Sequence, residues 1–271
     1  TLTDEVLSAM SCSNAYCNNS QVVVVPADKA ADFQSVDACS ALNFAVESGS
    51  AGKAEVEKMG YSFTEVKDQA TALMEVAAGT SDAAVIDSLM AAAMVGEGTG
   101  YASLTYTCGL NSEEYGVGFR KGSDLAQKLN DFFKASYADG SMMQIAETYG
   151  VQEALLEQAA SEFVASESDS DVAYIQEKGK LVVGITEFAP MDYKDANDEW
   201  IGFDADMAKL VAEKLGVEIE FVVIDWDMKV NELDSKNIDV VWNGMTLTEG
   251  VTAAMECTNA YCENAQVVIT K

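Results

Sequence analysis

The sequence predicts an α/β fold in which parallel sheets are flanked by helices. Short runs of Val, Ile and other strand formers alternate with amphipathic helical patterns along the 271 residues. This alternation is typical of strands that are joined by helical crossovers. A chain of this length can bury a sizeable core and fits one large or two medium domains, and we expect two lobes rather than independent domains.

The individual elements follow from local patterns. β-Branched runs predict strands, and helical spacing of apolar residues predicts helices, with Ser123-Asp124 and Ser141 as plausible helix starts. The predicted strands cover residues 21–25, 42–47, 83–86, 115–120, 180–185, 218–223 and 239–242. The predicted helices cover residues 52–59, 68–78, 88–94, 123–138, 142–149, 172–178 and 203–215.

One segment lacks the pattern of a packed element. Residues 152–171 are polar, acidic and rich in serine, and they end in the run SESDSD. Such a composition has too little apolar content to pack. The segment is therefore predicted to be an acidic linker between modules.

The two ends of the chain are near-copies of each other. Residues 1–23 return, with substitutions, as residues 246–268, at an offset of 245 positions (246 minus 1). This offset is too long for a solenoid repeat and suits a whole domain. The chain is interpreted either as a window cut out of register from a tandem array or as a circularly permuted domain with overlapping ends.

The charge of the chain excludes one class of partner. Its 45 acidic and 16 basic residues give a formal net charge of −29. Such a surface repels phosphate backbones and anionic lipid, so nucleic-acid binding is not expected. The plain interpretation of the charge is solubility in an exposed or salty environment.

The cysteines indicate disulfides outside the cytoplasm. The chain has six cysteines and no histidine, which argues against zinc sites built on imidazole and against histidine acid–base catalysis. Six cysteines allow 15 connectivities. Two pairs are five positions apart and need a turn to be bridged. These pairs are Cys12 with Cys17 and Cys257 with Cys262, and Cys39 with Cys108 is the remaining pair.

No apolar run is long enough for a membrane span, and no signal peptide is visible. Thr1 is not an initiator methionine. We expect a processed or excised piece whose export signal or anchor lies outside it.

Several motifs carry a resemblance to a known family. Residues 179–185 (GKLVVGI) are followed by residues 188–191 (FAPM) and 200–208 (WIGFDADMA). This order resembles the opening of the family 3 extracellular solute-binding proteins, the polar amino-acid receptors of ABC importers. Further segments in the family's order are residues 225–226, 233–239, 243–248 and 259–261, and its second half is resembled by residues 44–50, 81–88, 114–123 and 138–141.

The resemblance implies a two-lobe fold of the type II periplasmic-binding-protein class. Two crossover strands would join the lobes, with a ligand cleft between them, and the chain would carry the parts in permuted order. The implied parts are the end of lobe 1 and the first crossover (1–21), lobe 2 (22–110), the second crossover and return to lobe 1 (111–151), the linker (152–171), the first part of lobe 1 (172–245) and the duplicate of 1–26 (246–271). We predict that the front copy takes the crossover and leaves residues 255–271 surplus.

The same resemblance implies ligand-binding residues. Two aromatic rings, Phe188 and Trp226, would sandwich the ligand, and the carboxylate of Asp87 would meet its ammonium. Backbone and hydroxyl contacts would come from Gly244, Thr246 (with Thr3 or Thr248 nearby), Gly49, Ser50 and Ala51, and Glu187 is a possible stand-in for a missing aspartate. The alternatives are that the two rings are core aromatics and that Asp87 caps the next helix.

One departure from the family concerns the ligand. The family holds the α-carboxylate of its ligand with an arginine, and here that position is Val251, or Val6 in the front copy. Arg120, the only arginine, matches a position outside the cleft. Each lost charge-assisted bond costs about 1.5–3 kcal/mol. We therefore expect a cognate ligand other than an ordinary α-amino acid.

The leading functional hypothesis is a non-enzymatic, extracytoplasmic module, in the periplasm or at the cell surface, that binds a small polar solute without a cofactor. Its partners would be an ABC permease and possible adjacent modules. One alternative is an enzyme on the same fold, a dehydratase or lytic transglycosylase, with Glu187 or Asp87 as general acid. Another is a degenerate sensor or surface module.

Asp204 and Asp206 have the spacing of the first ligands of a calcium loop, but the loop's glycine and distal glutamate do not follow. Negative charge at a helix N-terminus explains the two aspartates better.

Overall fold

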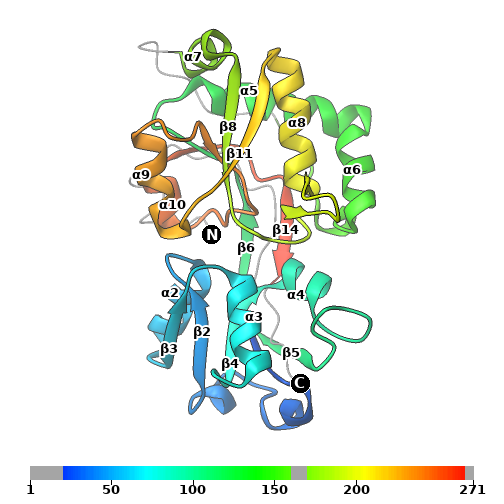
Figure 1. The fold of residues 1–271 in the computed structure, drawn as a ribbon, viewed down its shortest axis with the longest axis vertical. Coiled ribbons are helices and arrows are strands. Elements are labelled where there is room, and N and C mark those ends of the chain that lie inside the picture. Colours follow the sequence, from blue (N-terminus) through cyan, green and yellow to red (C-terminus); the bar gives the residue numbers. More distant parts are fainter. Residues whose placement is uncertain (1–20, 160–169, 266–271) are drawn as a thin grey trace. The chain divides into compact units, whose positions relative to one another are not determined.

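The computed structural model describes residues 21–159 and 170–265, which fall into two units (Figure 1). The small unit contains residues 21–113, and the large unit contains residues 114–159 and 170–263. The predicted two-lobe α/β class is confirmed. No helix among the described residues is long and apolar enough to cross a membrane.

The small unit is built on a five-stranded sheet with the order β3-β2-β4-β1-β5. Its strands are β1 (Gln21–Pro26), β2 (Asn43–Glu47), β3 (Ser62–Val66), β4 (Ala83–Asp87) and β5 (Leu104–Gly109). Strands β2, β3 and β4 are parallel to one another, whereas β1 runs antiparallel to β4 and β5. The sequence predicted β1, β2 and β4. It missed the outer strands β3 and β5, whose residues are mostly exposed or half-buried and lack a continuous apolar run.

Three helices of the small unit begin close to their predicted positions. They are α2 (Ala51–Met59), α3 (Gln69–Ala78) and α4 (Ser88–Met94), and two 3-10 helices, η1 (Ala27–Asp32) and η2 (Asp37–Cys39), precede β2. The Ser50 hydroxyl accepts a hydrogen bond from the Lys53 backbone at 3.0 Å and so caps α2. Asp68 caps α3 in the same way. Both α2 and α3 pack on the central strands of the sheet.

The large unit has a second five-stranded sheet, with the order β11-β8-β12-β7-β13. Its strands are β7 (Gly118–Phe119), β8 (Lys180–Ile185), β11 (Glu218–Val223), β12 (Val240–Val241) and β13 (Glu256–Cys257). Parallel pairing joins β8 to β11 and β12, and β7 runs antiparallel to both of its neighbours. Two short strands, β9 (Tyr193–Lys194) and β10 (Trp200–Ile201), form a hairpin.

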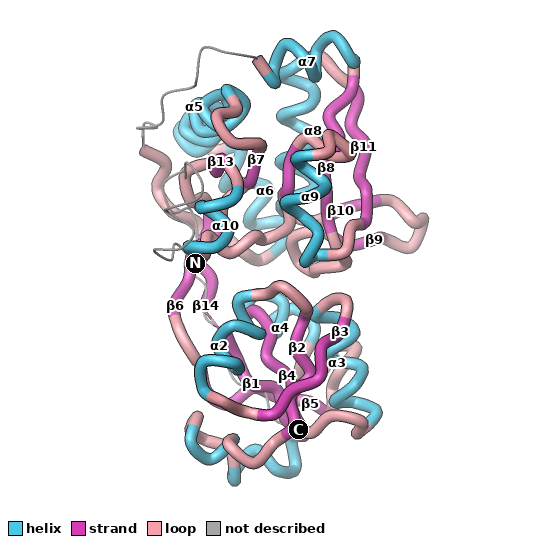
Figure 2. Tube along the Cα trace, turned by 90° about the vertical axis from the view of Figure 1, so that its left-hand side faces the viewer, coloured by secondary structure: helices cyan, strands magenta, loops and turns pink. Residues whose placement is uncertain are grey.

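Helices surround this second sheet (Figure 2). They are α5 (Asp124–Asp139), α6 (Ser141–Tyr149), α7 (Asp171–Lys178), α8 (Phe203–Leu215), α9 (Lys229–Asp234) and α10 (Glu249–Ala254), with 3-10 helices η3 (Gln152–Ala154) and η4 (Trp226–Met228). The sequence predicted α5 to α8 and missed the two six-residue helices. Strands β6 (Ser112–Tyr115) and β14 (Cys262–Ala265) pair with each other where the chain passes between the units.

An aromatic cluster forms the core of the large unit. The ring of Phe133 lies 5.7 Å from that of Trp242 and 5.1 Å from that of Tyr261. Phe203, at the start of α8, contacts Tyr261 at 5.6 Å. The Trp242 indole also donates a hydrogen bond to the Tyr261 hydroxyl at 3.2 Å. Trp242, at the end of a predicted strand, therefore belongs to the core.

The rear copy of the repeated sequence is part of the fold, so the prediction that residues 255–271 are surplus is wrong for the described part of that segment. Met255 and Tyr261 are fully buried, and β13 pairs with β7. The physical reason is chain continuity. The rear copy follows β12 directly through α10, whereas a segment from the far end of the chain would have to lose its freedom separately to dock there. Residues 1–20 and 266–271 lie outside the described residues.

The predicted linker is wrong at both ends. Ala154 is buried, Leu155 forms a bridge with Cys262, and the Leu156 backbone N–H donates to the Tyr261 carbonyl at 3.2 Å. At the other end, Ser170 caps α7 and Asp171 begins it. A composition with few apolar residues still packs where the backbone itself finds partners. Residues 160–169 lie outside the described residues.

The local disulfide predicted between Cys257 and Cys262 is also wrong. The Cys257 thiol is retained and lies 3.9 Å from the Met255 carbonyl oxygen, whereas Cys262 is disulfide-bonded. The predicted pair of Cys12 and Cys17 lies outside the described residues. Cys39 and Cys108 are both thiols in this structure.

Arg120 holds three parts of the large unit together. Its guanidinium lies 3.0 Å from Asp171 and 3.5 Å from Asp239, and it donates to the carbonyl oxygens of Leu233 and Ile238. Its side chain is only 11% exposed, and that of Asp239 is fully buried. The single arginine is therefore a structural group, in agreement with its predicted position away from the ligand.

Replacing Arg120 tests this role. The substitution R120M should lower the free energy of unfolding by about 3 kcal/mol, because it leaves buried carboxylates and carbonyls without a guanidinium. The matched control is K180M, which removes one partner of the exposed Lys180–Glu220 pair and should cost about 0–1 kcal/mol. Urea denaturation of both variants gives the comparison. Equal losses for the two would contradict the structural role of Arg120.

Candidate functional site

The residues predicted to bind ligand fall in both units. Phe188, Trp226, Gly244, Thr246 and Glu187 belong to the large unit, and Gly49, Ser50 and Asp87 belong to the small unit.

In the large unit, Gly244 packs directly on Phe188. Gly244 has a φ of 53°, and a Cβ atom on it would lie 2.5 Å from the Phe188 ring and 3.1 Å from the Tyr115 ring. Only glycine suits such a turn and such close contact. Tyr115 in turn meets Phe188 edge to face at 6.3 Å and forms a bridge with Thr246. The structure thus brings three predicted residues together around Tyr115, which the sequence had not marked as a site residue.

Phe188 lies in a closed turn. Its backbone N–H donates to the Asp192 carbonyl at 2.6 Å, and the Met191 N–H donates back to the Phe188 carbonyl at 2.9 Å. The Phe188 side chain is 3% exposed, so within this unit the ring is a packed group as well as a candidate ligand contact. Glu187, one residue earlier, is exposed.

Trp226 has a cation as its neighbour. The Lys229 ammonium lies 4.7 Å from the centre of the indole ring and donates to the Trp226 carbonyl at 2.9 Å. Both side chains are buried, with Lys229 only 6% exposed. The contact fixes the ring orientation of Trp226 by a cation–π interaction. No ring contact between Trp226 and Phe188 joins the two predicted aromatics within the described residues.

Asp204 fixes the backbone of the glycine turn. One of its carboxylate oxygens accepts a hydrogen bond from the Gly244 N–H, and the other accepts one from the Tyr261 hydroxyl. Asp204 is fully buried at the start of α8. The sequence was interpreted as placing Asp204 at a helix N-terminus for its negative charge. This interpretation accounts only for the position of Asp204 at the start of α8. Its main contacts hold Gly244 and Tyr261 in place.

Asp192 is a second buried carboxyl beside the first. It is fully buried, and neither carboxyl oxygen has a hydrogen-bond partner among the described residues. Burial, and then the neighbouring charge of Asp204, raise the pKa of Asp192 well above its usual value. Burial also raises the pKa of Asp204 to about 7, although its hydrogen bonds with Tyr261, Gly244 and Trp242 act in the opposite direction. The pair therefore keeps a proton near neutral pH.

In the small unit, Asp87 is held by two amides. Its Oδ1 accepts hydrogen bonds from Gln21 at 3.0 Å and from Gln69 at 3.2 Å, and its own backbone N–H donates to the Gln69 side chain at 2.8 Å. Asp87 precedes α4, but its side chain makes no capping hydrogen bond. The alternative that Asp87 is a helix cap is therefore wrong. The carboxylate is 3% exposed and is fixed in direction by its amide donors.

Gln21 connects Asp87 to a second acid. The same Gln21 nitrogen donates to Glu113 at 3.0 Å, and the Asn111 amide donates to Glu113 at 2.6 Å. A Cβ atom on Gly52 would come within 2.3 Å of the Gln21 Oε1, so α2 approaches this amide closely because residue 52 is glycine. Sequence reasoning missed Gln21, Gln69 and Glu113, since each stood in a segment that was interpreted only as secondary structure.

The glycine–serine turn shares an edge with Asp87. Gly49 and Ser50 follow β2, Asp87 ends β4, and these two strands are parallel neighbours. Their carboxyl ends therefore meet at the same edge of the sheet, which is where open α/β sheets bind ligands. Gly49 has a φ of 69°, and the Ser50 hydroxyl is used as the cap of α2. The structure thus brings the three small-unit residues to one edge.

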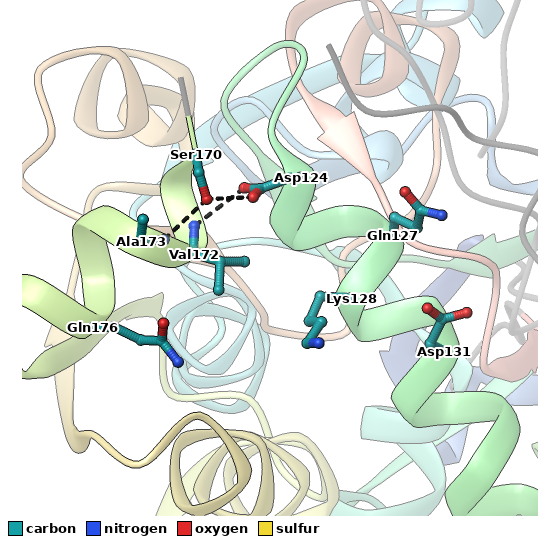
Figure 3. Close-up of a pocket in the computed structure, with 8 residues that line it drawn as sticks. All are labelled: Asp124, Gln127, Lys128, Asp131, Ser170, Val172, Ala173 and Gln176. Carbon is teal, nitrogen blue, oxygen red and sulfur yellow. Dashed lines mark hydrogen bonds between the residues drawn. The ribbon is translucent and has the colours of Figure 1, made fainter. Parts of the chain in front are cut away.

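A surface hollow between α5 and α7 is not this site (Figure 3). Its volume is about 370 Å³. Asp124 on α5 accepts hydrogen bonds from the Ser170 hydroxyl and from the Val172 backbone, so this carboxylate fastens the start of α7. None of the predicted ligand residues lines the hollow. No group of three or more metal-ligand side chains occurs within residues 21–159 and 170–265.

A model of a known protein family matches part of the chain. Residues 181–271 match the model of the bacterial extracellular solute-binding proteins, family 3. The resemblance predicted from the motifs is therefore confirmed. The matched segment includes Phe188, Trp226, Gly244, Thr246 and Val251.

Family 3 relatives match parts of the chain. The arginine-binding extracellular protein ArtP of Bacillus subtilis (strain 168) is 33% identical over 95 residues, 35% of this chain and 37% of ArtP. The L-cystine-binding protein TcyJ of Escherichia coli (strain K12) is 34% identical over 76 residues, 28% of this chain and 29% of TcyJ. The crystal structure of the ancestral amino acid-binding protein AncCDT-1, described as a precursor of cyclohexadienyl dehydratase, is 39% identical over 27% of this chain and 33% of that chain, with a TM-score of 0.27. The chain spans well under half the length of these curated relatives.

The carboxyl pair of the large unit predicts a pH dependence. Burial raises the pKa of Asp204 to about 7 in the folded state, so it keeps its proton up to about pH 7, whereas the unfolded chain loses the proton near the ordinary pKa of 3.8. The unfolded state therefore binds fewer protons in this window, and the free energy of unfolding should fall as the pH rises from about 4 to 7, by on the order of 3 kcal/mol.

The variant D192N tests the origin of this slope. An amide at position 192 removes a carboxyl whose own pKa is raised by burial, so the variant should lose less stability than the wild type between pH 5 and pH 7. Both proteins keep the same acidic surface, so general charge repulsion is common to them. Denaturant titrations at several pH values give the two slopes. Identical slopes would assign the pH dependence to other groups.

Proposed function

We propose that the chain is an extracytoplasmic solute-binding module that captures a small polar solute, an amino acid or a molecule like one, and delivers it to an ABC permease. The observation that carries this proposal is Asp87, a buried carboxylate directed by two amides at the ligand-binding edge of its sheet. The family 3 match of residues 181–271 supports it. Lobe closure on the ligand is part of the proposal.

Asp87 suits a ligand ammonium. A buried carboxylate that is already fixed by Gln21 and Gln69 loses little freedom when a cation binds, so its charge is preorganised. Gly49 and Ser50 lie at the same edge and offer backbone groups at the start of α2. The small unit thus supplies an acceptor for a cation beside backbone donors for polar groups.

The large unit supplies an apolar wall with backbone groups. Phe188 is held against Gly244, and Thr246 follows on the same turn. Asp204 and Tyr261 keep that turn in place. In this proposal Phe188 and Trp226 contact the apolar part of the ligand, and Gly244 and Thr246 bind its polar end.

The ligand class follows from Val251. ArtP and TcyJ are named for arginine and L-cystine, whereas this chain has valine where its family holds the ligand carboxylate with arginine. Val251 is only 8% exposed in α10. We propose a ligand in which an amine, rather than an α-carboxylate, provides most of the charge recognition. Neighbouring modules of a tandem array are a further part of this proposal.

An enzyme on the same fold is the second candidate, and AncCDT-1, described as a precursor of cyclohexadienyl dehydratase, is the observation that favours it. A general acid would be needed, and neither candidate fits that task as well as a binding role. Glu187 is exposed, and the Asp87 carboxylate is already engaged by two amide donors.

Isothermal titration calorimetry of the whole chain against amino acids, cystine and simple diamines tests the proposal. At least one solute with an ammonium group should bind, and D87N should weaken that binding about tenfold or more, because a charge-assisted bond is lost. The matched control is D32N, which removes one exposed carboxylate of the same unit and should leave the affinity unchanged. Absence of heat with every solute, or equal effects of the two variants, would contradict the proposal.

A further inference from the structure

Two thiols that are distant in sequence meet in the small unit. Cys39 ends η2, Cys108 lies on β5, and the two are 69 positions apart along the chain. Cys39 is fully buried in the cluster that includes Phe44 and Val46, and Cys108 packs against that cluster. The Cys39 thiol donates to the Ser35 carbonyl at 3.4 Å, and Cys108 lies close enough for the side chains of the two cysteines to interact. Both residues are present as thiols.

The backbone around the two thiols is already docked. The Thr107 hydroxyl, next to Cys108, donates to the Phe33 carbonyl at 2.6 Å. Tyr61 donates to the Val36 carbonyl at 3.2 Å, and the Cys39 N–H bonds to the same carbonyl at 3.0 Å. The segment 27–42 is thus attached to β5 on one side and to the residue that precedes β3 on the other, so the backbone on both sides of the two cysteines is held in place.

The pairing of the edge strand β5 is interrupted by a bulge where Cys108 lies. Strand β5 is the outer strand of the sheet, next to β1. Thr105 of β5 pairs with Val25 of β1, and Gly109 pairs with Val22. Between these two pairs the chain advances four residues on β5 but three on β1, so the pairing contains a bulge. A bulge leaves a residue unpaired and re-aims its neighbours. Edge strands with unpaired groups need protection from pairing with other chains.

We propose that Cys39 and Cys108 form a disulfide that fastens the segment 27–42 to the edge strand β5. The bond would replace the missing ladder contacts at the bulge by a covalent link. This inference rests on the small unit alone and does not depend on the proposed ligand.

The two sulfur atoms have different roles in forming the disulfide. Cys108 is half-buried, whereas Cys39 is fully buried, so Cys108 is the more accessible of the two thiols. The interaction with the Cys39 side chain also lowers the pKa of Cys108, and the same interaction, followed by burial, raises the pKa of Cys39. The Cys108 thiolate therefore attacks first, on an external disulfide such as glutathione disulfide, and releases one glutathione thiolate. Cys39 then loses its proton and displaces the second glutathione, so two protein thiols are oxidised as one external disulfide is reduced to two thiols.

Peptide mapping of the whole chain tests the proposal. After treatment with glutathione disulfide, blocking of remaining thiols and proteolysis without reductant, mass spectrometry should find one cross-linked peptide that contains both Cys39 and Cys108 and lacks two hydrogens. The variant C39S should instead leave Cys108 as a mixed disulfide with glutathione. A wild-type chain with both thiols still available to alkylation, or with glutathione alone on Cys108, would overturn the inference.

Thermal unfolding measures the effect of the bond on stability. Reduction should lower the Tm of the oxidised wild type by about 5–10 °C more than it lowers that of the double variant C39S/C108S. The double variant is the matched control because it retains the separate disulfide of Cys262. If a variant fails to fold, the alkylation rates of the two thiols in the wild type before and after oxidation decide the question, since protection of both supports the bond and protection of neither contradicts it.

Discussion

A single buried carboxylate connects the parts of the large unit on which its function depends. Asp204 begins α8, its oxygens bind the Gly244 backbone and the Tyr261 hydroxyl, and these partners lie in separate segments of the chain. Tyr261 in turn packs in the aromatic core with Phe133. Because a buried charge without partners costs several kcal/mol, these contacts depend on one another. The position of the glycine turn against Phe188 is therefore set by the core and not by the turn alone.

In the small unit, neutral amide groups hold the buried carboxylates. Gln21 lies between Asp87 and Glu113, and Gln69 reaches Asp87 from the start of α3. An amide can donate to two carboxylates at once, so the Gln21 side chain holds an oxygen of each acid in a fixed position.

The sequence predicted what depends on local pattern and on motif order. The buried strand β8 and the amphipathic helix α8 were found because their apolar residues recur at the right spacing. The outer strand β5 and the short helix α9 were missed, since long-range pairing and burial, not periodicity, stabilise them. The site was predicted in part. Phe188, Gly244 and Thr246 came from the family motif, but Tyr115, Asp204 and Gln21 act through contacts with distant residues that no local pattern contains.

The duplicated ends show where a pattern is informative and where it is not. Two similar copies predict the same structure, so their sequences alone could not decide which of them completes the sheet. In the described part of the chain, the rear copy supplies β13, which pairs with β7. Val251 lies in this copy, on a helix whose first turn is capped by the Thr248 hydroxyl. Val251 is only 8% exposed and is therefore part of the packed large unit, which agrees with a proposed ligand whose charge is recognised by Asp87.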